Sequence, residues 1–184
     1  MPSMPASSER ILASARRVLA AEGTAVLDAA ARLGEPFCRL VDAILRLPPG
    51  RVAVTGVGKS GIIGMKIAAT LASVGTPAFF LKPLDAVHGD LGMVSHEDLL
   101  LALSHSGETA EILSVVFAAK NIGARVAVMT GQAGSTLARE ADLVLEVPAA
   151  TEACPLGLAP TTSTTVTLAV GDALAMTLLE MRGF

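Results

Sequence analysis

The chain has 184 residues, of which 52% are hydrophobic and 17% charged, and its 14 Lys and Arg against 17 Asp and Glu leave a formal net charge of −3. This composition excludes a disordered or collagen-like chain and favours a single folded domain over residues 1–184. The mild negative charge and the lack of Trp and Tyr exclude the basic surfaces and aromatic stacking platforms that bind nucleic acids.

The cysteine count and the apolar runs indicate where such a chain resides. Cys38 and Cys154 are too few and too far apart for a disulfide framework or a zinc site, which favours a reducing cytoplasm. Glutamates interrupt the N-terminal stretch, so no secretory signal is predicted. Lys66 and Asp172 interrupt the longest apolar stretches, which are too short to span a membrane. We therefore expect a soluble cytoplasmic protein.

Two helices are predicted at the N-terminal end. Apolar residues recur at three- and four-residue spacing from Glu9 and continue to Gly34, which predicts the first helix. Pro36 fits the first turn of a second helix, which Pro48-Pro49 ends. The predicted layout is a disordered terminus, these N-terminal helices and an α/β core, at residues 1–8, 9–49 and 50–184.

Short apolar runs and helical segments alternate in the core. The runs are typical of parallel strands buried on both faces, and they lie at residues 52–55, 78–81, 99–103, 126–129 and 143–147. Helices are predicted near residues 60–74, 108–122, 134–140 and 161–181. This alternation predicts a doubly wound, Rossmann-like or flavodoxin-like α/β sheet of about five parallel strands. Ligands of such sheets bind beyond the carboxyl ends of the strands, so the loops there are the candidate sites.

The loop after the first strand is rich in glycine and runs from Thr55 to Gly61. Its glycines allow the backbone to approach a ligand closely, and the N–H groups of the following helix attract an anion. A phosphate is the expected guest. We therefore expect Gly58, Lys59 and Ser60 to contact the ligand, although a solvated first-turn lysine is the structural alternative for Lys59.

Two nucleotide motifs compete for the same loop. A Walker A loop needs a glycine where this chain has Ala53, so a nucleoside-triphosphate site is excluded. The glycines at 56, 58 and 61 fit a dinucleotide fingerprint after a strand. That motif also needs an acidic residue at the end of the second strand, where this chain has Leu81-Lys82-Pro83. A dinucleotide site is therefore disfavoured.

A second candidate loop follows the third strand, and we call residues 104–109 the serine loop. The hydroxyls of Ser104, Ser106 and Thr109 surround Gly107 at the start of a helix. Side-chain O–H and backbone N–H donors that converge in this way form a nest for a phosphate monoester. Ordinary N-capping by Ser106 is the structural alternative.

Carboxylates and a histidine lie near the same edge of the predicted sheet. A glutamate beside apolar residues can have its pKa raised toward neutrality and transfer protons, and Glu111 and Glu152 are the candidates. Glu108 is favoured as a surface acid that complements the helix dipole. His88 stands in a glycine-containing loop, where it can donate to a sugar hydroxyl, move a proton or be purely structural. The three histidines show no metal-binding spacing.

These motifs resemble the sugar isomerase (SIS) domain of the D-arabinose 5-phosphate isomerases. The resemblance covers nearly the whole chain after the first helices. The serine loop alone is typical of any SIS domain, whereas the stretch Glu152–Ser163 together with the His88 loop is much more specific. The other matching segments are Gly58-Lys59-Ser60-Gly61, residues 68–73 and Gly75-Thr76-Pro77.

The resemblance implies interconversion of D-ribulose 5-phosphate and D-arabinose 5-phosphate. In Gram-negative bacteria this step supplies 3-deoxy-D-manno-octulosonate for lipopolysaccharide. The family pattern places its catalytic residues on Lys59, Glu111 and Glu152. It places its substrate contacts on Gly75, Thr76 and His88, and its phosphate nest on the serine loop.

Two features depart from the family pattern. The chain ends at Phe184, before the segment in which the family carries a further active-site histidine and a C-terminal pair of CBS domains. Lys82 stands where members often have a histidine that takes part in divalent-metal binding. We expect a truncated chain of the family and no metal ligands.

Aldose–ketose isomerisation moves a proton between adjacent carbons through an enediol, which needs a base but no metal or organic cofactor. We expect the serine loop to hold the phosphate while His88 and Lys59 contact the sugar oxygens. Glu152 would move the carbon-bound proton and Glu111 would orient or relay it, although the two roles could be exchanged.

Two other functions stay open at this stage. One is a non-catalytic sugar-phosphate sensor, and the other is an isomerase of a different phosphosugar. The first 50 residues show no basic helical face of the kind a DNA-binding regulator would carry. The high apolar content, with a mean hydropathy of +0.59, and the family resemblance predict a homotetramer with active sites near subunit interfaces.

Overall fold

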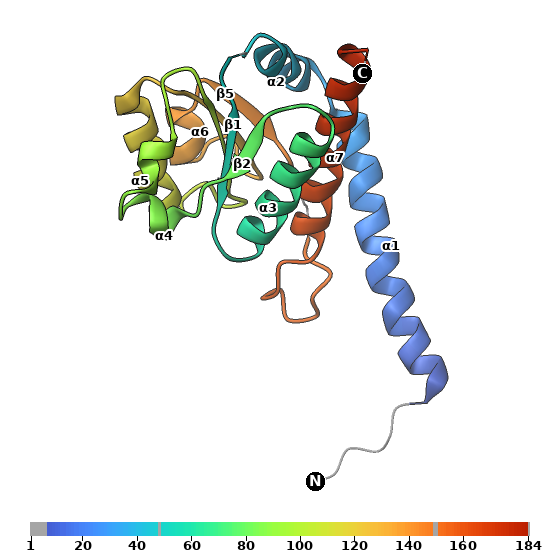
Figure 1. Cartoon of the computed structure of the whole chain (residues 1–184). Coiled ribbons are helices and arrows are strands. Elements are labelled where there is room, and N and C mark those ends of the chain that lie inside the picture. The colour runs from blue at the N-terminus through green and yellow to red at the C-terminus, as the bar shows by residue number, and fades with distance from the viewer. Residues whose placement is uncertain (1–6, 48, 149–150, 184) are drawn as a thin grey trace.

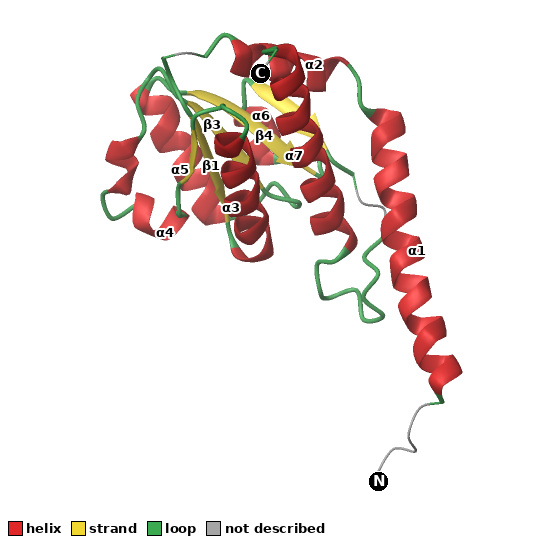
Figure 2. Ribbon diagram, turned by 45° about the vertical axis from the view of Figure 1, so that its right-hand side comes forward, coloured by secondary structure: helices red, strands yellow, loops and turns green. Residues whose placement is uncertain are grey.

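Five short strands pair into one parallel sheet. The computed structural model of the chain describes residues 7–47, 49–148 and 151–183, and the strand order is β2-β1-β3-β4-β5. The strands are β1 (Val52–Gly56), β2 (Ala78–Phe80), β3 (Leu99–Leu103), β4 (Arg125–Thr130) and β5 (Leu143–Glu146). Every residue of β1 and β3 is buried, as continuous apolar runs predict for central parallel strands. The predicted five-stranded doubly wound sheet is confirmed (Figure 2).

Helices precede the sheet and connect its strands. They are α1 (Ser8–Arg32), α2 (Glu35–Leu45), α3 (Gly58–Ser73), α4 (Pro83–Ala86), α5 (Ala110–Ile122), α6 (Thr136–Glu140) and α7 (Thr162–Met181), with the 3-10 turn η1 (Asp90–Met93). The two N-terminal helices and the four predicted core helices are confirmed. The sequence pattern did not reveal α4 and η1, because single turns are too short to show a helical period.

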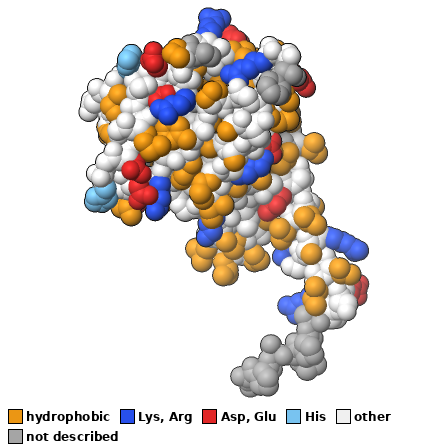
Figure 3. All heavy atoms as spheres, in the orientation of Figure 1, with side chains coloured by type: hydrophobic (Ala, Val, Ile, Leu, Met, Phe, Trp, Pro, Cys, Tyr) orange, Lys and Arg blue, Asp and Glu red, His pale blue; other side chains and the backbone are white. Residues whose placement is uncertain are grey.

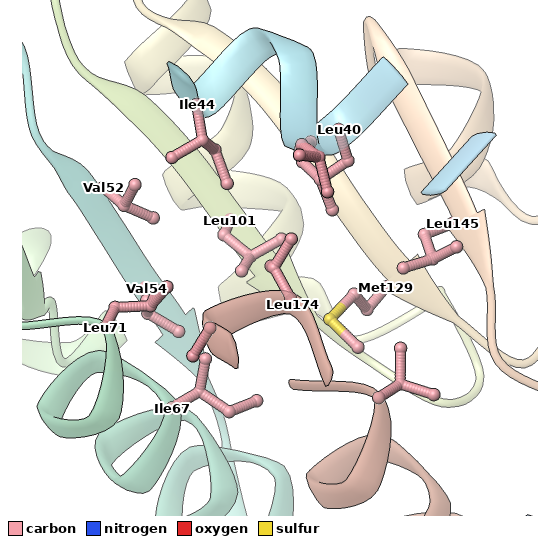
Figure 4. Packing of buried hydrophobic residues seen from close by; sticks show 14 of the residues in the cluster. Leu40, Ile44, Val52, Val54, Ile67, Leu71, Leu101, Met129, Leu145 and Leu174 are labelled. Atoms are coloured by element: carbon pink, nitrogen blue, oxygen red, sulfur yellow. The ribbon is translucent and has the colours of Figure 1, made fainter. Parts of the chain in front are cut away.

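Alternation along each strand divides the core into two layers. On one face of the sheet, α2, α3 and α7 cover side chains that interlock in a single cluster (Figure 4). The members labelled there include Ile44, Val54, Ile67, Leu101, Met129 and Leu174. On the other face, α4, α5 and α6 cover the alternate strand residues, among them Ala53, Ala102 and Val128, and contribute Ile112 of α5 and Leu137 of α6 to the same cluster. Side chains of neighbouring strand positions point to opposite faces, which explains this division.

The last helix of the chain is a core element. Within the described residues, α7 alone is long and apolar enough to cross a membrane by length and composition. It packs against α1, α2 and α3, and Val166, Leu174 and Leu178 are fully buried. Its apolar character therefore serves the interior of this domain.

The first helix extends away from the body of the molecule (Figure 1). It begins at Ser8, and the Ser7 hydroxyl caps it by accepting a hydrogen bond from the Arg10 N–H. The helix therefore starts one residue earlier than predicted. The rest of the terminus predicted to be disordered, residues 1–6, lies outside the described residues.

An ion pair between a buried carboxylate and a partly exposed arginine joins the starts of β1 and β3. Asp98, which precedes β3, is 1% exposed. It accepts hydrogen bonds from the Arg51 N–H (2.7 Å) and guanidinium (3.1 Å) and from the Ser95 N–H (2.9 Å). The Arg51 guanidinium also lies over the Phe79 ring of β2. Burial alone raises the pKa of Asp98, but the hydrogen bonds from Arg51 and Ser95 outweigh it, so the pKa is lowered.

Replacement of Asp98 by Asn removes the charge that pairs with Arg51, so we expect a loss of about 2 kcal/mol of unfolding free energy. A carboxyl with a lowered folded-state pKa stabilises the fold above its unfolded value of about 3.9, and this contribution is lost as pH falls below that value. Urea unfolding of both proteins from pH 7 to pH 3 tests this. The difference between them should shrink in acid, and a constant difference would contradict the assignment.

Candidate active site

The two predicted ligand loops start side by side because their strands are neighbours. β1 pairs directly with β3, and Gly56 lies opposite Leu103 at the carboxyl end of the pair. The glycine-rich loop and the serine loop follow these two residues. Figure 1 shows the carboxyl ends at the lower side of the sheet, where α3 and α7 also begin. The structure therefore brings Lys59 and Ser104 to one edge.

The glycine-rich loop closes tightly onto the start of α3. A Cβ added at Gly56 would lie 2.9 Å from the Ser60 backbone, and one at Gly61 would lie 2.7 Å from the Gly56 carbonyl oxygen. Gly58 has a φ of +59°, which disfavours any side chain there. No side-chain hydrogen bond caps α3, so its first N–H groups remain available to an anion beside the exposed Lys59.

The serine loop has a defined internal geometry. The hydroxyl of Ser104, which is 4% exposed, lies 3.0 Å from the Thr109 hydroxyl and accepts a hydrogen bond from the Gly107 N–H at 3.1 Å. The hydroxyl of Ser106 accepts from the Glu108 N–H at 3.3 Å. Thr109, rather than Ser106, is the N-cap residue of α5, and it makes no side-chain capping bond. Three hydroxyls and an uncapped helix start thus occupy one loop, and its role as a phosphate nest stays a prediction.

Glu152 is held by the start of α7. Its carboxylate accepts hydrogen bonds from the Thr161 N–H at 2.7 Å, from the Ser163 N–H at 3.3 Å and from both of their hydroxyls. Burial alone raises the pKa of Glu152, but these hydrogen bonds outweigh it and the pKa is lowered. The expectation of a pKa raised toward neutrality is therefore wrong. The neighbouring hydroxyls stabilise the carboxylate instead of leaving it among apolar groups.

Glu111 presents the opposite situation. It lies in the first turn of α5, directly after the serine loop, and its side chain is exposed. No hydrogen bond or ion pair from the described parts of the chain involves its carboxylate. Both oxygens are therefore available to a ligand at this edge.

His88 lies beyond the carboxyl end of β2. It follows α4, its side chain is exposed, and Gly89 with a φ of +133° turns the chain after it. Because α4 packs against α5, His88 belongs to the same side of the sheet as Glu111. Its position is compatible with contact to a sugar bound between the loops.

Gly75 and Thr76 lie at the opposite end of the sheet. They precede β2, whose first residue pairs with Val52 at the start of β1. Thr76 is 1% exposed, and its hydroxyl and the Gly75 carbonyl accept hydrogen bonds from the Arg182 guanidinium. A strand of five residues separates them from Lys59, about 15 Å at the usual rise. Within one chain they do not join the other candidate residues.

Comparisons with known proteins decide the family. A family model described as "SIS domain" matches residues 45–177. The solved structure of the Escherichia coli CFT073 protein c3406 in complex with A5P superposes with a TM-score of 0.94 at 41% identity, over 97% of this chain and 95% of that one. The chain belongs to the SIS domain family.

Curated SIS relatives carry the name of one activity. The chain is 52% identical over 171 residues to arabinose 5-phosphate isomerase KdsD of Pseudomonas aeruginosa, which covers 93% of this chain and 52% of that relative. It is 47% identical over 175 residues to arabinose 5-phosphate isomerase KpsF of Escherichia coli, covering 95% and 55%. The chain thus spans about half the length of the curated relatives it matches.

Metal ligands are not clustered in this SIS domain. Across residues 7–47, 49–148 and 151–183, no three His, Cys, Asp or Glu side chains lie close enough to hold an ion together. Lys82, at the position where a histidine is often found in the family, pairs with Asp85 at 3.3 Å.

The sequence pattern did not reveal one contact at this edge, the hydrogen bond between the Glu108 carboxylate and the Thr136 N–H. The Glu108 carboxylate accepts a hydrogen bond from the Thr136 N–H at 2.8 Å, so it ties the serine loop to α6 and is not merely a surface acid. No spacing rule could have shown this, because the two residues are 28 positions apart. The only sequence signal was the predicted start of a helix near residue 134, because the first N–H groups of a helix can donate to a carboxylate.

Replacement of Glu152 by Gln should destabilise the protein even without substrate. The amide retains one acceptor oxygen but loses the charge that the start of α7 stabilises, so we expect a loss of about 1–2 kcal/mol. Urea unfolding of the substrate-free protein measures it. Unchanged stability would mean that the carboxylate does not anchor α7 in solution.

Proposed function

We propose that this SIS domain is an aldose–ketose isomerase that interconverts D-ribulose 5-phosphate and D-arabinose 5-phosphate through an enediol. The observation that carries the proposal is that the serine loop and the Lys59 loop follow two paired strands, β3 and β1, and so begin side by side at one edge of the sheet. Similarity to a protein solved with A5P, and to curated arabinose 5-phosphate isomerases, supports the choice of sugar.

The geometry supports different ligand contacts for the different loops of the site. Ser104, Ser106 and Thr109 hold the phosphate, which fixes the position of C1 and C2. Lys59 and His88 contact the sugar oxygens from the two sides of the edge. Gly58 and Ser60 contribute the N–H groups of the α3 start, which attract negative charge that develops during enolisation.

Glu111 takes the proton-transfer role first expected of Glu152, and Glu152 takes a positioning role. The oxygens of Glu152 are occupied by donors of Thr161 and Ser163, and its pKa is lowered, which makes it a weak base. Glu111 has an exposed side chain and follows the serine loop in the chain. We therefore assign the carbon-bound proton to Glu111 and the placement of the α7 start to Glu152.

Enediol chemistry predicts that the enzyme exchanges the transferred hydrogen with solvent. Incubation of the chain with D-ribulose 5-phosphate in deuterium oxide, followed by NMR, should show a new aldose that carries deuterium. Glu111→Gln should abolish the exchange, lowering it at least about 100-fold, while binding of the sugar phosphate stays measurable. Exchange at the normal rate in this variant would reject Glu111 as the base. Binding without any aldose from the unmodified chain would favour a sensor, or a requirement for the further active-site histidine that the family resemblance places after Phe184.

We also propose that the chain assembles as a homotetramer. Within α1, which lies wholly in the described residues, Ala29 alone is buried. Leu19 and Leu27 are 70% and 72% exposed, and Figure 3 shows hydrophobic side chains along this helix and over the lower end of the body. A groove of about 610 Å³ between α1 and the segments that follow β4 and β5 reaches Thr162 at the start of α7. Apolar surface of this kind favours contact with further copies near the site.

Charges placed on α1 should separate the copies. Leu19→Lys combined with Leu27→Lys should lower the molar mass measured by light scattering, because each lysine must lose water to enter an apolar interface. Leu84→Lys on α4, where the leucine is 60% exposed, is the matched control and should leave the mass unchanged. An unchanged mass in the double variant would exclude α1 from the interface.

The place of the reaction follows from these proposals. Arabinose 5-phosphate formed here would supply 3-deoxy-D-manno-octulosonate for lipopolysaccharide, as the family resemblance implies. We place the protein in the cytoplasm. The packing of α7 in the core and the exposure of Cys38 as a free thiol support this location.

A further inference from the structure

A second segment of the chain supports the serine loop from behind. We call residues 130–138, which comprise the end of β4, the following turn and the first residues of α6, the buttress. The His105 carbonyl accepts from the Gly131 N–H, and the Gly107 carbonyl accepts from the Leu137 N–H, both at 3.0 Å. With the Glu108–Thr136 bond at 2.8 Å, the buttress holds three positions of the serine loop.

Glycines on both sides make this contact close. Gly107 has a φ of +67°, and a Cβ added there would lie 2.0 Å from the Ser135 hydroxyl oxygen. A Cβ at Gly131 would lie 2.4 Å from the His105 ring. Either side chain would push the serine loop and the buttress apart. The backbone of the serine loop is therefore shaped by its contact with the buttress.

Glu108 supplies the one side-chain hydrogen bond that reaches from the serine loop to α6 among the described residues. Its lowered pKa is caused first by the Thr136 N–H and then by the Thr136 hydroxyl, with a further contribution from Arg139. The carboxylate therefore stays ionised as an acceptor at neutral pH. It is engaged by the buttress, whereas the hydroxyls of Ser104, Ser106 and Thr109 form the nest.

We propose that Glu108 is a positioning residue for phosphate binding, because its bond to Thr136 holds the serine loop in the conformation in which its hydroxyls converge. This inference rests on the proposed role of the serine loop. A loop that is already ordered binds its ligand without the cost of ordering it. Loss of the anchor should weaken binding of the phosphate group itself, whatever sugar is attached to it.

Calorimetric titration of the full chain with inorganic phosphate and with D-arabinose 5-phosphate tests this. Glu108→Ala should weaken both ligands by the same factor, about three- to tenfold, which is the value of one ordinary protein hydrogen bond. Turnover at saturating substrate should be unchanged. Glu108→Gln keeps an acceptor oxygen and should restore most of the affinity.

A change on the other side of the bond gives an independent test. Thr136→Pro removes the donated N–H at the first position of α6, where proline is well tolerated and where the extended Ser135 backbone accommodates it. It should weaken phosphate binding as Glu108→Ala does, and the double variant should show no further loss. Glu140→Ala breaks the Lys120 ion pair at the far end of α6 and should bind normally.

Normal phosphate affinity in Glu108→Ala would overturn the inference, as would a Gln variant as weak as the Ala variant. A fall in turnover with unchanged affinity would overturn it too. Ser106→Ala separates this failure from that of the proposed function. If Ser106→Ala binds phosphate normally, the serine loop is not the phosphate site. If Ser106→Ala binds weakly while Glu108→Ala binds normally, the proposed function stands and the positioning role of Glu108 falls.

Discussion

The parallel pairing of β1 with β3 is the constraint on which the site depends. Residue 56 lies opposite residue 103 in this pairing, so the loops that follow the two strands must begin within one strand spacing of each other. The helices after them leave to opposite faces of the sheet, α3 to one and α5 to the other. Ligands of doubly wound sheets bind beyond the strand ends where the chain divides in this way. The pair between Arg51 and the buried Asp98 carboxylate joins the other end of the same strands.

The site combines backbone and side-chain donors that are placed before any ligand arrives. Glycines at 56, 58 and 61 bring the start of α3 against the end of β1. The serine loop is joined to the buttress by hydrogen bonds at His105, Gly107 and Glu108. Glu152 stabilises the start of α7 in a comparable manner. The carboxylates at this edge differ in their contacts, because the oxygens of Glu152 accept hydrogen bonds from N–H donors whereas the Glu111 side chain is exposed.

The structure places most, but not all, of the candidate residues that the resemblance suggested at one edge of the sheet. Lys59, the serine loop, Glu111 and His88 are placed by the carboxyl ends of β1, β3 and β2, where the strand pattern alone directs the search. Gly75 and Thr76 were suggested by the family pattern and lie at the opposite end of the sheet. Contact between them and a ligand at this edge would require another copy of the chain, for which the exposed leucines of α1 provide a surface.

The amino-acid sequence by itself determined the class of fold, the helices longer than one turn and the loops that follow the carboxyl ends of the strands. Buried parallel strands and amphipathic helices differ in the spacing of their apolar residues, which can be read from a short stretch of sequence. Glycine or serine directly after a strand shapes only the adjacent loop, so this signal can also be read locally. Only the tertiary structure decided which glutamates accept hydrogen bonds from backbone N–H groups. Whether a carboxylate such as Glu108 or Glu152 meets N–H donors depends on residues up to 28 positions away, and no local pattern records which helix start will pack against it.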